Sequence, residues 1–256
     1  MIVRKSEAEI EGMARAGALL AETLALVAEH LEPGVEMREL DRIADEHIES
    51  KGGYPTSKGY KGFPAALCIS PNSMVVHGIP GDYRAREGDL ISLDLGVTLD
   101  GLVADSAVTL PVGEITGGAQ RLLDVCQEAL AAGIEQAQVG NRLSDISHAV
   151  QTVVEEAGFS VVRSLVGHGV GRSYHEDPQI PNYGPPGRGP GVHAQRDVRG
   201  RLRVAPGRGQ QGGGEPAGPG QQVIAVRVTE PESFAGQLPG LVPSAGMESV
   251  LAEQEQ

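Results

Sequence analysis

Two aspartates and three histidines have the residue types and spacing that metal-dependent chemistry requires. Asp94 and Asp105 lie on either side of Asp100-Gly101, between two runs of mostly aliphatic and β-branched residues. Because this dipeptide is typical of a two-residue hairpin turn, we expect paired positions to sum to 201. The two carboxylates would then share one face as diagonal neighbours, about 7–8 Å apart. Carboxylates at that spacing can converge on two metal ions about 3.5–4 Å apart.

The histidines lie in contexts that suit a ligand loop. His168 stands between glycines in Gly-His-Gly-Val-Gly, and His175 follows seven residues later. Flanking glycines allow unusual backbone dihedrals and close approach of other groups. His77 follows the apolar run Met-Val-Val. From the residues alone, each histidine also fits a structural role, and the two aspartates also fit the polar face of a half-exposed hairpin.

Taken together, these motifs resemble those of type I methionine aminopeptidases. Three segments carry the resemblance: Asn-Ser-Met-Val-Val-His-Gly-Ile-Pro ending at Pro80, the aspartate pair, and Gly-His-Gly-Val-Gly-Arg-Ser-Tyr-His-Glu-Asp-Pro-Gln-Ile-Pro-Asn-Tyr ending at Tyr183. The similarity runs from about residue 6 to residue 189. It implies the pita-bread fold, an α/β (α+β) architecture with a pseudo-twofold repeat of helix-helix-strand units around a central antiparallel sheet.

The resemblance also implies an activity and roles for the five residues. The activity would be removal of the initiator methionine from nascent proteins when the next residue is small. Two divalent metal ions would be the cofactor, and the ligand types accept cobalt, manganese, iron or zinc. Asp94 would bind one ion, Asp105 would bridge both, and His168 would bind the other. His77 and His175 would be the catalytic, substrate-contacting residues, with His175 near the scissile carbonyl.

The end of the chain departs from the family pattern. The family has two further glutamate ligands, but the region expected to hold the first reads Arg-Gly-Arg-Leu-Arg at residues 199–203. Glu215 and Glu230 precede prolines, yet neither has the expected context. Residues 191–220 contain nine glycines, three prolines and five arginines. We therefore divide the chain into a catalytic domain, residues 1–189, and an atypical segment, residues 190–256.

This departure leaves three interpretations open. The chain can be an active aminopeptidase, a catalytically impaired relative that binds peptides without cleaving them, or a product that does not fold stably. A change of coding frame near codon 190 would explain the altered composition. That hypothesis predicts an Ile-Glu-Pro-like strand in another frame of the nucleotide sequence.

The elements that must position these residues follow from local patterns. Ser6 and Glu9 form a capping box, and apolar residues recur at helical spacing up to Pro33-Gly34. A second helix should start at Met37 and end before Gly52-Gly53. The other expected elements are a strand over residues 65–70 that returns through 74–77, helices over 118–137 and 143–157, a strand over 159–163 and a strand over 222–229. An offset of 106 residues superimposes the two helix pairs together with their bounding glycines, which predicts two similar halves.

Bulk composition excludes several function classes. The net charge of −13 leaves no excess of Lys or Arg for nucleic acid or an anionic membrane. The sequence has no apolar run of 18 residues and no signal-peptide pattern, and its two cysteines fit a reducing compartment. We therefore expect a cytoplasmic protein, and we take it to be a monomer. The resemblance implies that its partner is the N-terminal methionine of nascent peptides near the ribosome.

Overall fold

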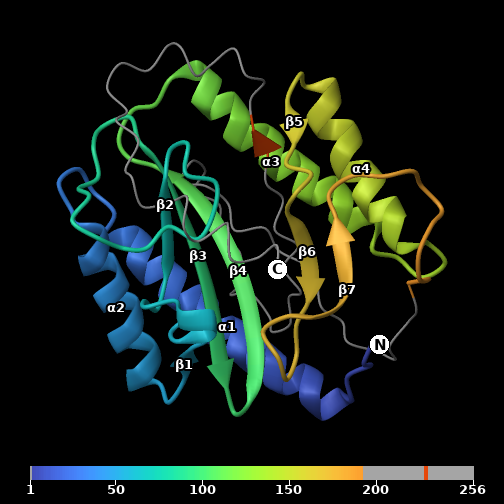
Figure 1. Cartoon of the computed structure of the whole chain (residues 1–256), viewed down its shortest axis with the longest axis horizontal. Helices are drawn as coiled ribbons and strands as arrows, with labels where there is room; N and C mark the ends of the chain where they lie inside the picture. Colours follow the sequence, from blue (N-terminus) through green and yellow to red (C-terminus); the bar gives the residue numbers. More distant parts are fainter. Residues whose placement is uncertain (1, 193–227, 230–256) are drawn as a thin grey trace, which may run out of the picture.

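Helix pairs and strands alternate twice along the chain. The computed structural model describes residues 2–192 and 228–229 (Figure 1). The first part contains α1 (Glu7–Glu29), α2 (Met37–Ser50), β1 (Tyr54–Pro55), a 3₁₀ turn (Tyr60–Gly62), β2 (Cys68–Pro71), β3 (Leu90–Leu99) and β4 (Leu102–Pro111). The second contains α3 (Gly117–Gln136), α4 (Leu143–Glu156), β5 (Ser160–Val161), β6 (Val166–Gly169), β7 (Glu176–Pro181) and β8 (Val228–Thr229).

The main sheet is built around the β3–β4 hairpin. β3 pairs antiparallel with β4 and, on its other side, with β1 and β2. The hairpin register runs from Leu90 opposite Pro111 to Leu99 opposite Leu102, so paired positions sum to 201 as expected. Asp100 and Gly101 both have positive φ, at 52° and 76°, as a type I′ turn requires. The predicted hairpin and its register are confirmed.

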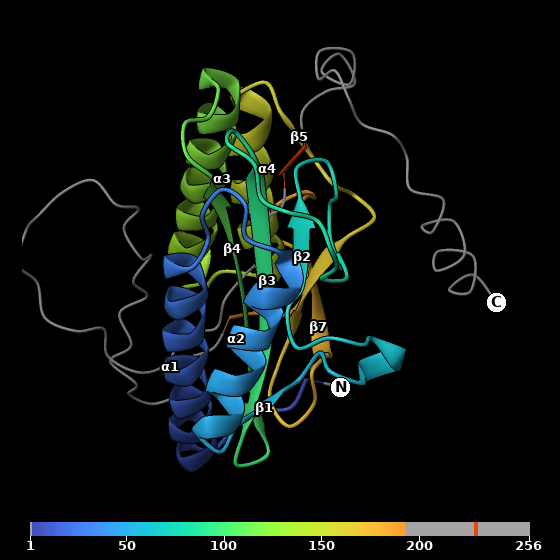
Figure 2. The same cartoon turned by 90° about the vertical axis from the view of Figure 1, so that its left-hand side faces the viewer.

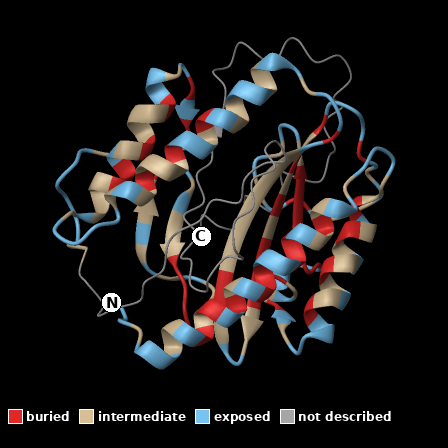
Figure 3. Cartoon of the chain, turned by 180° about the vertical axis from the view of Figure 1, so that it is seen from behind, coloured by how far each residue is buried: buried red, intermediate tan, exposed pale blue. Residues whose placement is uncertain are grey.

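The first helix pair covers one face of this sheet. Ser6 caps α1 with the predicted capping box. α1 packs against β3, β4 and α2 (Figure 2). Figure 3 shows buried residues concentrated where these elements meet. Each large aliphatic side chain buried there stabilises the fold by roughly 1.5–3 kcal/mol. The largest fully buried ones are Met37, Leu40, Ile48, Leu67, Ile69, Ile91, Leu93 and Leu95.

The second helix pair repeats the geometry of the first at its boundaries. Gly34 and Gly140, which the offset of 106 pairs, have φ values of 96° and 102°. Gly52 and Gly158, which it also pairs, have φ values of 77° and 84°. These left-handed conformations strongly favour glycine. α3 and α4 pack around a smaller core formed by Val125, Ala129, Val150, Val154, Phe159 and Val161.

One expected strand does not form. Residues 74–77 are an irregular loop, not the return strand of a hairpin with β2. Asn72 and His77 both have positive φ, at 53° and 55°, which a regular strand does not allow. The loop touches β2 instead through the Ile69 amide, which donates to the Gly78 carbonyl at 2.9 Å. The apolar run before His77 therefore does not indicate a strand.

Part of the strand expected over residues 222–229 is present. Val228 and Thr229 form β8, which pairs antiparallel with β5. The remainder of the strand expected over 222–229 lies outside the described residues. In the described part of the chain, no helix is both long and apolar enough to span a membrane.

Candidate metal-dependent active site

The β3–β4 hairpin supplies the two predicted carboxylates. Asp94 faces Ala107 on β4 and Cys68 on β2, so it sits in the middle of the sheet. Asp105 faces Gly96 across the hairpin, two residues from the partner of Asp94. Directly opposed residues share a face, so the two aspartates project from the same side.

A second hairpin supplies two histidines. β6 and β7 pair antiparallel, and residues 170–175 connect them. A Cβ at Gly169 would lie 2.6 Å from the Asp177 carbonyl oxygen, so glycine is required there for close packing. His168 leans toward the first hairpin, and its Nε2 lies 3.4 Å from Asp105 Oδ2. The two hairpins meet at this contact.

A backbone hydrogen bond sets the tautomer of His168. Its Nδ1 lies 3.0 Å from the Gly169 carbonyl oxygen, which can only accept. Nδ1 therefore donates to this carbonyl, and Nε2 is the ring nitrogen that faces Asp105. A metal-binding imidazole needs this arrangement, in which a second group holds one ring nitrogen while the other binds the ion.

Aromatic rings surround the histidines. The ring centroids of His168 and His175 are 4.1 Å apart, and His175 stacks on Tyr60 at 5.3 Å. Tyr174 lies 4.9 Å from His175, and its hydroxyl is 3.0 Å from Ser57 Oγ. Sequence reasoning did not single out Tyr60 or Tyr174. The available signal was that Tyr60, like His168, lies in a short glycine-flanked segment.

Electrostatics place the remaining predicted residues in the same cluster. Burial raises the pKa of Tyr174, and the charges of Asp105 and Asp94 raise it further, so both carboxylates lie near its ring. Burial also lowers the pKa of His175 to about 4, and charge repulsion from His168, Lys61 and His77 adds to the effect. The structure therefore brings Asp105, His168 and His175 into contact, while Asp94 shares the sheet face of Asp105 and His77 lies on the loop after β2.

The donor set fits a divalent metal, although the described residues do not complete a site. Two ligands bound at about 2.1 Å from one ion are roughly 3.0–3.4 Å apart, which matches the contact of Asp105 with His168. Within residues 2–192 and 228–229, however, no three His, Cys, Asp or Glu side chains converge tightly enough to hold an ion. Glu215 and Glu230, the candidate glutamate ligands, lie outside those ranges.

Comparison with known proteins decides the family. The model of metallopeptidase family M24 matches residues 11–200. The chain belongs to family M24. It is 52% identical to methionine aminopeptidase of Clostridium perfringens over 76% of this chain and 78% of the relative. It is 49% identical to methionine aminopeptidase 1 of Bacillus subtilis over 74% and 77%.

Solved M24 structures confirm the expected fold. The methionine aminopeptidase of Thermotoga maritima matches with a TM-score of 0.74 and 42% identity, over 75% of this chain and 78% of that one. A prolidase from Pyrococcus furiosus matches with a TM-score of 0.61 and 23% identity, over 70% and 52%, which shows a shared fold alone. The family and fold predicted from the motifs are both confirmed.

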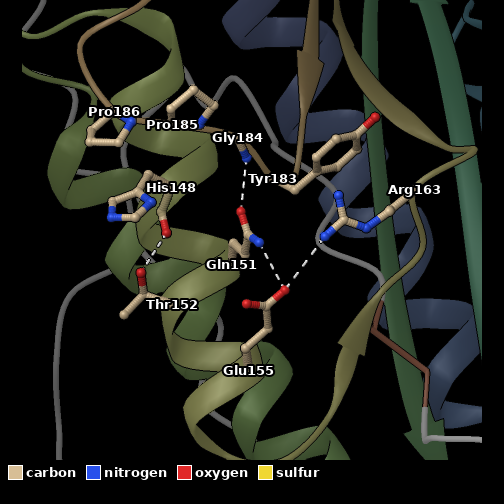
Figure 4. A pocket seen from close by; sticks show the side chains of 9 residues that line it. All are labelled: His148, Gln151, Thr152, Glu155, Arg163, Tyr183, Gly184, Pro185 and Pro186. Carbon is tan, nitrogen blue, oxygen red and sulfur yellow. Dashed lines mark hydrogen bonds and ion pairs between the residues drawn. The ribbon is translucent and has the colours of Figure 1, made fainter.

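A separate pocket lies away from these five residues. It has a volume of about 610 Å³ between α4, Arg163 and residues 183–186 (Figure 4). Gln151 links its walls, because it donates to Glu155 and accepts from the Gly184 amide. None of the five predicted residues lines this pocket.

Proposed function

We propose that this M24 protein is a metal-dependent aminopeptidase that removes the N-terminal methionine from peptides whose second residue is small. The observation that carries the proposal is the contact of Asp105 with His168, since it joins the hairpins of the two halves at one point. Relatives named methionine aminopeptidase, at 52% and 49% identity, support the substrate class.

Two divalent ions are the cofactor that this family and this donor set support. Asp94, Asp105 and His168 would hold them, with Asp105 between the two. When bound, such ions lower the pKa of a shared water and polarise the scissile carbonyl.

Histidine and tyrosine side chains near the proposed metal ligands would orient the substrate. His175 rests against Tyr60 and His168, so its orientation is set before a peptide arrives. A preset donor at the carbonyl stabilises the oxyanion without reorganisation during the reaction. His77 would contact the peptide from the irregular loop after β2. Tyr60 and Tyr174 lie against His175, with ring centroids 5.3 and 4.9 Å from its own.

The proposal includes the cellular location and the oligomeric state of the enzyme. We place it in the cytoplasm as a monomer, where it meets emerging N-termini near the ribosome. The net charge of −13 disfavours direct binding to ribosomal RNA, so recognition would rest on the peptide itself.

Metal content and turnover together test this function. Inductively coupled plasma analysis should find two equivalents of a divalent metal per chain, and the loaded protein should release methionine from Met-Ala-Ser. Asp105→Asn should lower kcat/KM by at least about 100-fold, because one ligand charge is lost at the shared position. Asp100→Asn is the matched control. It lies at the turn of the same hairpin, 67% exposed, and should stay within about twofold of wild type.

Peptide binding without metal and without turnover would contradict the proposal. It would favour the impaired relative that binds peptides only. Equal losses in Asp105→Asn and Asp100→Asn would contradict the assigned role of Asp105.

A further inference from the structure

A part-buried ion pair ties the N-terminal segment to the loop that carries His175. Lys5 Nζ pairs with Glu176 Oε2, and these side chains are only 12% and 16% exposed. The pair joins positions 171 residues apart in the sequence. Burying two charges costs solvation free energy, which a surface attachment would avoid. Such a pair therefore indicates a specific geometric role.

Glu176 also organises the loop itself. Its Oε1 accepts the backbone amides of Arg172 at 2.8 Å and Ser173 at 3.1 Å. Burial acts to raise the pKa of Glu176, but the hydrogen bonds from Lys5 and these two amides hold it below its ordinary value. One carboxylate thus binds Lys5 on one oxygen and the turn preceding Tyr174 and His175 on the other.

Lys5 and Glu176 pack closely against the backbone of the loop at Gly171. A Cβ at Gly171 would lie 2.2 Å from Lys5 Cε and 2.8 Å from Glu176 Oε1. The Gly171 carbonyl in turn accepts the Val103 amide at 2.7 Å, two residues before Asp105. A second ion pair, between Arg172 Nη2 and Glu9 Oε1 at 2.6 Å, adds a contact from α1. The loop is therefore held between the N-terminal segment and β4.

We propose that Lys5 is a positioning residue that acts through Glu176 to fix the loop bearing Tyr174 and His175 against the carboxylates of β3 and β4. Lys5 donates to the Val3 carbonyl and to Glu176, and it acts on the loop through Glu176. The expected effect of Lys5 on catalysis rests on the proposed aminopeptidase activity. The expected effect of Lys5 on the position of the loop does not.

Fluorine NMR tests the positioning without metal or substrate. The chain has five tyrosines and no tryptophan, so fluorotyrosine labelling gives five resonances. The Tyr174 line, assigned by Tyr174→Phe, should shift or broaden in Lys5→Met. Tyr83 and Tyr183 lie in other contacts and serve as internal references. Lys51→Met is the matched control, since Lys51 forms an ion pair with Glu22 at the surface, and it should leave the Tyr174 line in place.

Two further variants keep the test decisive. Lys5→Arg retains the charge and should restore most of the wild-type Tyr174 line. If Lys5→Met does not fold, Glu176→Gln takes its place, because it keeps an acceptor for the two amides but loses the ion pair. A Tyr174 line unchanged in the folded variant would overturn the proposal.

Kinetics supply the second readout. With Met-Ala-Ser, Lys5→Met should lower kcat roughly 10- to 100-fold and leave KM within about threefold, because a misplaced group costs rate more than binding. An unchanged kcat would overturn the proposal. If the wild-type protein has no turnover, the proposed function fails, while the fluorine spectra still decide whether Lys5 positions the loop.

Discussion

At the scale of single residues, one half-buried carboxylate connects a helix to the site. Asp41 on α2 accepts the backbone amides of Ala66 at 2.9 Å and Leu67 at 2.8 Å. This fixes the chain just before Cys68, the β2 residue opposite Asp94. Burial is the largest influence on Asp41 and raises its pKa above the ordinary 3.8, although the two amides act in the opposite direction.

The raised pKa of Asp41 predicts a pH-dependent stability. Because the folded state holds the proton more tightly than the unfolded state, the contribution of Asp41 is fully present below about pH 3.8 and is lost as pH rises through the raised pKa. Asp41→Asn keeps an acceptor but has no charge to bury. The free energy of unfolding of wild type should therefore fall relative to Asp41→Asn as pH rises above 3.8 and through the raised pKa, as measured by urea unfolding.

Asp145 supplies a control of opposite sign. The backbone amides of Arg142 and Gly187 lower its pKa below the ordinary value. Wild type should therefore lose stability relative to Asp145→Asn as pH falls through the lowered pKa. A difference between wild type and Asp41→Asn that stays constant with pH would rule out the burial of charge at Asp41.

At the scale of elements, local signals explain which features were predictable. The capping box and the Asp100-Gly101 turn depend on neighbours in the sequence, so α1 and the β3–β4 register could be read directly. The prediction of a strand over residues 74–77 was wrong. Their apolar side chains match a strand pattern, but the long-range contact to β2 sets their conformation. Tyr60 gave no clear signal for the same reason, since it meets His175 only in the folded chain.

Because β3 packs tightly against the loop that carries His175, one methyl group added to β3 should change both stability and activity. A Cβ at Gly96 would lie 2.8 Å from two ring carbons and from the hydroxyl oxygen of Tyr174. Gly96→Ala should lower stability by about 1–3 kcal/mol through overpacking and reduce kcat/KM, because the displaced ring rests against His175. Thermal unfolding and Met-Ala-Ser hydrolysis measure the two effects.

Gly17 is the matched glycine for this experiment. It lies inside α1, and a Cβ there would meet no atom within 4 Å. Gly17→Ala should raise stability by about 0.5–1 kcal/mol through helix propensity, with unchanged kcat/KM. Equal effects at both positions would show that the Tyr174 contact is unimportant.

At the scale of the whole molecule, the two halves contribute unequally to the core. Among the described residues, the cluster around α1, α2 and the sheet contains eighteen buried residues, and the cluster between α3 and α4 contains six. The site draws its carboxylates from the first half and His168 and His175 from the second. Its geometry therefore depends on the half with the smaller core.

Hydrogen exchange should reveal this difference. Local opening requires less free energy where fewer apolar contacts are lost, so amides of α3 and α4 should exchange faster than those of α1 and β3. Mass spectrometry of exchanged peptides measures this directly, with metal absent. Equal protection in both halves would indicate a single cooperative unit.

The ion pair between Lys5 and Glu176 has a consequence for how the protein is made. Lys5 leaves the ribosome first, and its partner is 171 residues behind it. At about 5–20 residues per second, this is a wait of roughly ten to thirty seconds, during which the lysine is exposed on an incomplete chain. An enzyme proposed to trim newborn proteins would thus acquire its own reactive geometry only after residue 176 has been synthesised.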